Sequence, residues 1–185
     1  IYVKDNFLPS NLIEYFENDK SIFEEVKTPG KSFWVKNLPK EFIDAVCDKI
    51  SILEGCKIEN ILMFIRQAKK SQDVDWRIHN DSIIENQKPD RAVVLFLSKE
   101  DGLNGTAFWS HKDYGDTYDG EGTEEFNKLL TEDANDLSKW ELNTVIGHKQ
   151  NRLISYPCKY FHSKYPNEFK NNREVIVMFY KTNRN

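Results

Sequence analysis

Two segments among the first 55 residues carry apolar residues at the three- and four-residue spacing of an amphipathic helix. The first predicts a helix over residues 9–18, with Ser10 as its N-cap, and the second predicts a helix over residues 39–53. The apolar stripes of these helices are formed by Leu12, Ile13, Phe16, Phe42, Val46, Ile50 and Leu53. A short strand over residues 1–3 is expected before them. We therefore expect residues 1–55 to form a helical support that packs on the rest of the chain.

After Gly55 the pattern changes to short runs rich in β-branched and aromatic residues, separated by Gly, Pro, Asn and Asp. Runs of this kind are typical of strands. The seven runs cover residues 61–67, 74–81, 91–98, 105–110, 151–157, 159–165 and 173–181. Seven short strands after two helices predict a mainly β (α+β) fold in which antiparallel strands form a sandwich or barrel. A length of 185 residues agrees with one domain, residues 1–185, whose β core spans 61–181.

One polar, acidic and glycine-bearing segment, residues 111–140, interrupts the strand pattern. Its second part predicts a helix over residues 123–139. Insertions of this length between strands are often lids or binding loops. A solvated excursion without a functional role is the alternative.

Composition and charge argue against several classes of protein. The net charge of −4 disfavours a nucleic-acid binder, because such proteins neutralise phosphates with basic residues. The sequence has no apolar run of about 18 residues, which excludes a membrane-spanning helix. Three irregularly spaced cysteines predict free thiols rather than a disulfide framework or a structural zinc site. With no secretion signal visible, we expect an intracellular, cytoplasmic location.

The first candidate for chemistry is the pair His79 and Asp81. Side chains alternate along a strand, so residues two apart share a face, and an imidazole and a carboxylate would lie side by side. Together with a histidine from a distant strand they would complete the 2-His-1-carboxylate triad that favours non-haem Fe(II). By itself the pattern His-x-Asp is common by chance.

The second half of the chain adds His162, late in a strand-like run, and Arg173, which opens the final run eleven residues later. This order of His79, Asp81, His162 and Arg173 resembles that of the iron(II)/2-oxoglutarate-dependent dioxygenases. The resemblance is closest to their prolyl 4-hydroxylase-like branch, including its small phage and bacterial members. The runs DNFL at residues 5–8, LFLS at 95–98 and GTAF at 105–108 also resemble that branch.

The resemblance implies a double-stranded β-helix, or jelly roll, with N-terminal helices packed on one sheet. It implies that His79, Asp81 and His162 hold Fe(II), and that 2-oxoglutarate chelates the metal while its distal carboxylate pairs with Arg173. O₂ would be the second co-substrate, succinate and CO₂ the co-products, and ascorbate an auxiliary reductant. The formal charges agree with this division of roles. The iron, one aspartate and the 2-oxoglutarate dianion sum to −1, which the arginine neutralises in a bidentate pair.

Other residues compete for these roles. Arg66 and Arg152 are rival anchors for 2-oxoglutarate, and Arg66 is also a candidate for lining the pocket. His111 is the rival third metal ligand, for which we prefer a substrate-side or structural role. His148 is expected to be exposed.

Some prolyl hydroxylases use a strand tyrosine to hydrogen-bond the distal carboxylate, and the corresponding run VVLF at 93–96 has no hydroxyl. Tyr156, Ser155 and Thr106 are candidates to replace it.

The resemblance allows a peptidyl or free amino acid, a small metabolite or an alkylated nucleobase as substrate, and we favour hydroxylation of a C–H bond in a peptidyl or free amino acid. The acidic insertion would repel nucleic acid and attract a basic peptide. Four aromatic residues could form a rim for a peptide or proline ring, although packing is the more common role of aromatic residues near strands: Trp76, Trp109, Tyr114 and Tyr118. The competing interpretations are a cupin-like metal enzyme that does not use 2-oxoglutarate and a non-catalytic jelly-roll binding module. The sequence leaves the oligomeric state open.

Overall fold

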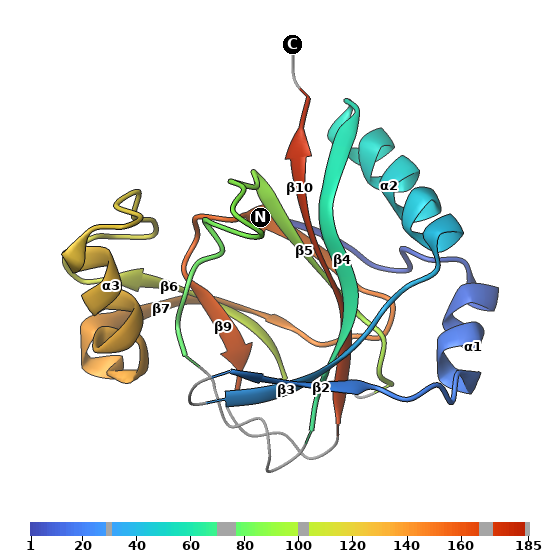
Figure 1. Cartoon of the computed structure of the whole chain (residues 1–185), viewed down its shortest axis with the longest axis horizontal. Helices are drawn as coiled ribbons and strands as arrows, with labels where there is room; N and C mark the ends of the chain where they lie inside the picture. The colour runs from blue at the N-terminus through green and yellow to red at the C-terminus, as the bar shows by residue number, and fades with distance from the viewer. Residues whose placement is uncertain (29–30, 70–76, 100–103, 167–171, 184–185) are drawn as a thin grey trace.

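The computed structural model describes residues 1–28, 31–69, 77–99, 104–166 and 172–183, which form two antiparallel β-sheets with helices on their outer sides (Figure 1). The strands are β1 (Tyr2–Lys4), β2 (Glu24–Thr28), β3 (Lys31–Lys36), β4 (Ile58–Ala68), β5 (Arg91–Phe96), β6 (Gly105–His111), β7 (Trp140–Gly147), β8 (Leu153–Pro157), β9 (His162–Tyr165) and β10 (Arg173–Thr182). The helices are α1 (Ser10–Asn18), α2 (Lys40–Glu54) and α3 (Glu124–Thr131), and two short 3₁₀ turns, η1 (Asp133–Asn135) and η2 (Leu137–Lys139), follow α3. Within the described residues, no helix is long and apolar enough to cross a membrane.

The larger sheet has the strand order β1-β8-β5-β10-β4-β3-β2, and the smaller sheet has the order β7-β6-β9. Alternation along β5 shows how the larger sheet is covered on both faces. Val93 and Leu95 pack in the core cluster that contains the helices, whereas Val94 and Phe96 pack in the cluster that contains Phe108 of the smaller sheet. Burial on both faces explains why this run is apolar at nearly every position.

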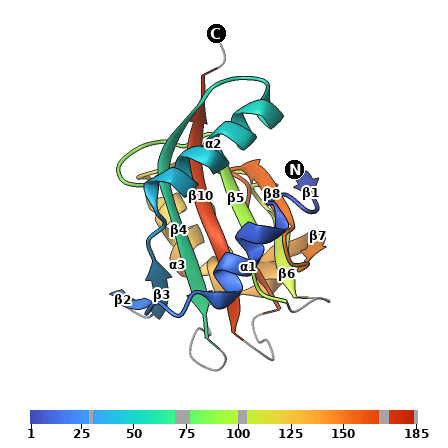
Figure 2. The same ribbon diagram turned by 90° about the vertical axis from the view of Figure 1, so that its right-hand side faces the viewer.

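Helices α1 and α2 lie on the outer face of the larger sheet, in front of β4, β10 and β5 (Figure 2). Most of their apolar stripe is buried there, as the helical spacing predicts, but the expectation is wrong for Leu53, which lies in the last turn of α2 and is 42% exposed. The expectation that Ser10 caps the first helix is wrong. Pro9 holds the N-cap position of α1 and Pro39 that of α2, and neither helix has a side-chain cap. Gly55 ends α2 in the left-handed conformation at φ 68°, where glycine carries no steric penalty.

The sequence pattern did not predict three of the strands, β2, β3 and β7. Strands β2 and β3 pair with each other and extend the larger sheet, so the predicted support over residues 1–55 is not purely helical. Strand β7 pairs with β6 although its residues 141–144 are exposed. These strands lie at or next to sheet edges, where backbone hydrogen bonds to a neighbour hold a strand that buries few side chains.

The segment between β6 and β7 packs on the smaller sheet, on the side opposite to α1 and α2 (Figure 1). Leu129 of α3 is buried in this packing, and Phe126 is buried against the ring of Tyr118 in the same segment. The predicted helix over residues 123–139 is correct only for its first half, since α3 ends at Thr131. Asp136 then accepts a hydrogen bond from the Ser138 backbone N–H and starts the separate turn η2. Such local side-chain bonds compete with helix continuation.

Candidate metal centre

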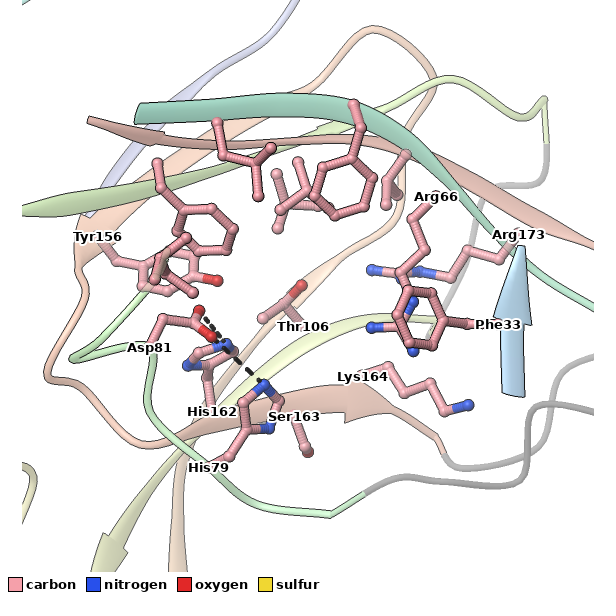
Figure 3. Close-up of a pocket in the computed structure, with 17 residues that line it drawn as sticks. Phe33, Arg66, His79, Asp81, Thr106, Tyr156, His162, Ser163, Lys164 and Arg173 are labelled. Carbon is pink, nitrogen blue, oxygen red and sulfur yellow. Dashed lines mark ion pairs between the residues drawn. The ribbon is translucent and has the colours of Figure 1, made fainter. Parts of the chain in front are cut away.

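A single antiparallel β-bridge joins the segment that carries His79 and Asp81 to His162. The backbone N–H of His79 donates to the carbonyl of His162 at 3.0 Å, and the reverse bond measures 2.8 Å. The N–H of Asp81 donates to the carbonyl of Cys158 at 2.8 Å. The predicted strand over 74–81 is therefore not present in its described part, residues 77–81, which forms only this bridge. The bridge nevertheless turns His79 and Asp81 to the same side, toward His162 at the start of β9 (Figure 3).

The side chains of His79, Asp81 and His162 converge on one point, and their ligand atoms all lie within 4.8 Å of one another. Nε2 of His162 is 3.2 Å from Oδ2 of Asp81, and Nε2 of His79 is 3.8 Å from Oδ1 (Figure 3). The side chains of His162 and Asp81 are 7% and 14% exposed, whereas that of His79 is 33% exposed. His162 and Asp81 are thus largely buried, and the candidate site is open to solvent beside His79.

Both histidines are oriented by the same backbone contact. Nδ1 of His79 lies 2.8 Å from the carbonyl of Arg77, and Nδ1 of His162 lies 2.9 Å from the carbonyl of Tyr160. Because a carbonyl only accepts, each Nδ1 carries a proton, so Nε2 is the atom of each ring that would bind a metal at the shared point, after loss of any proton that it carries. This second contact is the one that fixes the tautomer and ring orientation of metal-ligating histidines.

The charge states also suit a cation. Burial lowers the pKa of His79 to about 4, and the nearby His162 acts in the same direction. Burial alone would lower the pKa of His162, but the adjacent Asp81 carboxylate outweighs burial and raises it. For Asp81 burial alone would raise the pKa, yet the positive charge of His162, its hydrogen bond and the field of Arg66 lower it. At neutral pH the group therefore offers a neutral imidazole and a carboxylate, the forms in which these groups bind metals.

Two fully buried side chains anchor the segments that carry the ligands. Ile78 and Phe161, which directly precede His79 and His162, are both 0% exposed and pack in the cluster that contains Leu129 of α3. The N–H of Ile78 donates to Ala134 O at 2.9 Å, beyond α3. The insertion between β6 and β7 therefore supports the candidate metal centre from behind.

The three ligands border a cavity of about 330 Å³ between the two sheets. One part of its wall is apolar and consists of Leu62, Phe64, Ile84, Val94, Val175, Val177 and Phe179. At the other end lie the basic side chains Arg66, Lys164 and Arg173, together with Phe33 (Figure 3). Thr106 lies between this basic end and the metal ligands (Figure 3). The predicted anchor Arg173 thus lines the same cavity as the three predicted ligands.

The three residues predicted to offer a hydroxyl group to the distal carboxylate do not all face the cavity. Tyr156 and Thr106 line the cavity and are each 2% exposed. The Tyr156 ring packs 4.8 Å from that of His162, between ring centroids. Ser155, the neighbour of Tyr156, points to the other face of the larger sheet and contacts Arg91 and Tyr180.

Of the predicted substrate-side residues that the structure describes, Arg66 alone lines the cavity. Trp109 is buried, donates from Nε1 to Ser163 and is not among the described residues that line the cavity. His111 is 2% exposed and pairs with Asp133, so the structure favours its structural alternative. Trp76 lies outside the described residues. The expectation that His148 is exposed is wrong, because it is 4% exposed.

Sequence reasoning missed two residues at the basic end of the cavity. Lys164 follows His162 by two positions in β9, so strand alternation alone would have placed it on the same face. Phe33 had no such signal, because β3 was not predicted and only the pairing of β3 with β4 brings it to the cavity.

The chain matches no protein-family model and no curated protein by sequence. Solved structures are similar in fold. HygX from Streptomyces hygroscopicus, with nickel, 2-oxoglutarate and hygromycin B bound, superposes with a TM-score of 0.62 at 9% identity, over 98% of this chain and 82% of HygX. The non-heme alpha ketoglutarate dependent carbocyclase SnoK gives a TM-score of 0.68 at 10% identity, over 96% of this chain and 78% of SnoK. A prolyl-4-hydroxylase from Pseudomonas putida gives 0.53 at 11% identity, over 99% and 92%.

Identities this low establish a shared fold and leave the activity to be argued from the site. The chain is a mainly β protein that has the double-stranded β-helix fold of these 2-oxoglutarate oxygenases.

Proposed function

We propose that this protein is an Fe(II)- and 2-oxoglutarate-dependent dioxygenase that hydroxylates a C–H bond. The observation that carries the proposal is the convergence of His79, Asp81 and His162 at one end of a cavity whose other end is basic. Two imidazoles and one carboxylate form the donor set that favours non-haem Fe(II) and leaves coordination positions open. The shared fold with 2-oxoglutarate oxygenases supports the same conclusion.

The residues present fit the metal. Both Nε2 atoms and the Asp81 carboxylate face one point, and each histidine is held by a backbone carbonyl. His79, Asp81 and His162 are therefore the residues we assign to the metal. The bound iron and 2-oxoglutarate would supply the oxidising chemistry with O₂, leaving succinate and CO₂ as co-products. Ascorbate is the reductant we would add to keep the metal ferrous.

Arg173 is the residue we assign to the distal carboxylate of 2-oxoglutarate. It opens β10 at the basic end of the cavity, where a guanidinium offers two parallel N–H donors to a carboxylate. We also assign contacts with the co-substrate to Thr106, which lies between Arg173 and the metal ligands, and to Tyr156, which lies beside Asp81 (Figure 3). The apolar wall lowers the local dielectric, which strengthens these charged interactions.

For the prime substrate we propose a peptidyl or free amino acid, as in prolyl hydroxylation, or another small molecule. The P. putida neighbour is a prolyl-4-hydroxylase, and HygX was crystallised with hygromycin B. The net charge of −4 argues against a nucleic-acid substrate.

The test is an anaerobic titration of the Fe(II)-loaded protein with 2-oxoglutarate, followed by visible absorption. A weak metal-to-ligand charge-transfer band is expected, and admission of O₂ should release succinate. A cupin-like enzyme would bind metal without consuming 2-oxoglutarate, and a binding module would do neither.

Two substitutions assign the roles. Asp81→Asn should abolish the band and metal binding while the protein stays folded, whereas Asp119→Asn, which removes a carboxylate that is 70% exposed, should change neither. Arg173→Gln should weaken 2-oxoglutarate binding far more than metal binding. Equal loss of both would mean that Arg173 has a structural role.

A further inference from the structure

A second arginine, Arg66, reaches the basic end of the cavity from the strand next to Arg173. In the pairing of β4 with β10, Arg66 lies opposite Val175, and Arg173 lies opposite Ala68. Residues two apart on a strand share a face, so Arg66 and Arg173 are diagonal neighbours on the face that lines the cavity. Diagonal positions are about 7–8 Å apart in a sheet, within the reach of two long side chains for one ligand group.

Each of these guanidinium groups lies over an aromatic ring. The Arg66 guanidinium carbon is 5.1 Å from the centre of the Phe33 ring, and that of Arg173 is 5.3 Å from the centre of the Phe96 ring. An aromatic face contacts the plane of a guanidinium and leaves the N–H groups at its edge for a planar acceptor. The two arginines are thus held at one end of the cavity (Figure 3).

Thr106 gives an independent indication of a ligand. Its side-chain hydroxyl is buried and has no hydrogen-bond partner among the described residues, and the residue is only 2% exposed. A buried hydroxyl without a hydrogen-bond partner is unfavourable, and a ligand oxygen would supply that partner. Since Thr106 lies between the metal ligands and the two arginines (Figure 3), the ligand has to extend along that line.

We propose that Arg66 is a specificity-determining residue that holds the distal carboxylate of 2-oxoglutarate together with Arg173, so that the cavity selects a keto-diacid over a keto-monoacid. This inference rests on the proposed function. A carboxylate has about four lone-pair sites and accepts two guanidinium forks at once. Among the described lining residues, Arg66, Lys164 and Arg173 are basic and Asp81 is the acidic residue, so a dianion matches the cavity better than a monoanion does.

The test compares 2-oxoglutarate with 2-oxopentanoate, which has the same length and chelating group but lacks the distal carboxylate. Both are titrated by calorimetry into the anaerobic Fe(II)-loaded protein. In Arg66→Gln the affinity for 2-oxoglutarate should fall by roughly tenfold or more, because a hydrogen bond to a charged group contributes about 1.5–3 kcal/mol and 1.4 kcal/mol is tenfold. The affinity for 2-oxopentanoate should stay within about threefold of the wild type.

Two further variants keep the inference falsifiable. Arg66→Lys keeps the charge but not the fork and should retain part of the preference for the diacid. Arg152→Gln is the control, because Arg152 pairs with Asp5 at the surface and is not among the described residues lining the cavity. Its ratio of the two affinities should equal that of the wild type. Each variant is first checked for metal affinity and thermal unfolding.

The outcomes separate this inference from the proposed function. If the Fe(II)-loaded wild type binds neither keto acid, the proposed function is wrong. If the wild type binds 2-oxoglutarate and Arg66→Gln weakens both acids equally, Arg66 only shapes the cavity and the inference is wrong. An unchanged affinity for 2-oxoglutarate in Arg66→Gln also refutes it and would assign Arg66 to another ligand, such as an anionic prime substrate.

Discussion

Leu129 tests whether the segment between β6 and β7 is a fixed support for the candidate metal centre. Its side chain is 0% exposed and packs with Ile78 and Phe161, which directly precede His79 and His162. Leu129→Ala removes the methyl groups that fill this cluster and leaves a cavity behind α3. Substitutions of this kind in well-packed cores lower the free energy of unfolding by about 2–5 kcal/mol.

This magnitude is large enough to measure in urea. With a dependence of about 2 kcal/mol per molar urea, the unfolding midpoint should fall by about 1–2.5 M. Trp109 and Trp140 lie in the same cluster and report its unfolding by fluorescence. Because the cluster holds the two segments that carry the ligands, the affinity for Zn²⁺ should fall on the order of tenfold, as for other residues that orient metal ligands.

Leu137→Ala is the matched control, since Leu137 belongs to the same segment but is 50% exposed. Its free energy of unfolding should stay within about 0.5 kcal/mol of the wild type. If Leu129→Ala were equally harmless, the segment would not be docked in solution and the support we assign to it would be refuted.

Three other predictions follow from single contacts. Gly105→Ala should lower the free energy of unfolding, measured in a urea titration, by roughly 2–3 kcal/mol. The reason is that the alanine Cβ would overlap the carbonyl of Ile146, on the neighbouring strand β7. An unchanged unfolding midpoint would contradict this pairing. The hydrogen bond from Lys36 lowers the pKa of Asp19 to about 2, so this pair stabilises the fold above about pH 4, and the stabilisation is lost as the pH falls toward 2. Asp19→Asn should flatten that part of the stability curve, and an unaltered acid transition would count against the pair. Cys158 is 1% exposed, and burial raises the pKa of its thiol. Iodoacetamide at pH 8 should therefore leave Cys158 unmodified until the protein unfolds, as measured by mass spectrometry. Rapid labelling of the native protein would disprove the burial of Cys158.

Strand alternation explains which candidates could be sorted from sequence and which could not. Thr106 and Trp109 differ by an odd number of positions in β6, so the sequence already required them to face opposite sides of the sheet. It did not tell which side faces the cavity. That choice depends on the larger sheet, whose inner face packs against Phe108, and on α3, which covers Trp109.

The sequence by itself determined the elements whose pattern is local. The apolar stripes of α1 and α2, the continuous apolar run of β5, and the spacing of His79 and Asp81 each follow from the geometry of a few neighbouring residues. The order of His79, Asp81, His162 and Arg173 also indicated one site before any coordinates, because it resembled a known arrangement.

Only the tertiary structure decided how distant segments meet. The bridge between His79 and His162, the placement of Arg66 beside Arg173, and the hairpin that brings Phe33 to the cavity all depend on backbone pairing between segments far apart in the chain. Edge strands such as β2 and β7 bury few side chains, so their order comes from hydrogen bonds to a neighbouring strand and leaves little pattern in their own residues. The residue types therefore indicate the chemistry of the site, whereas the packing of the two sheets determines its shape and the contacts of each residue.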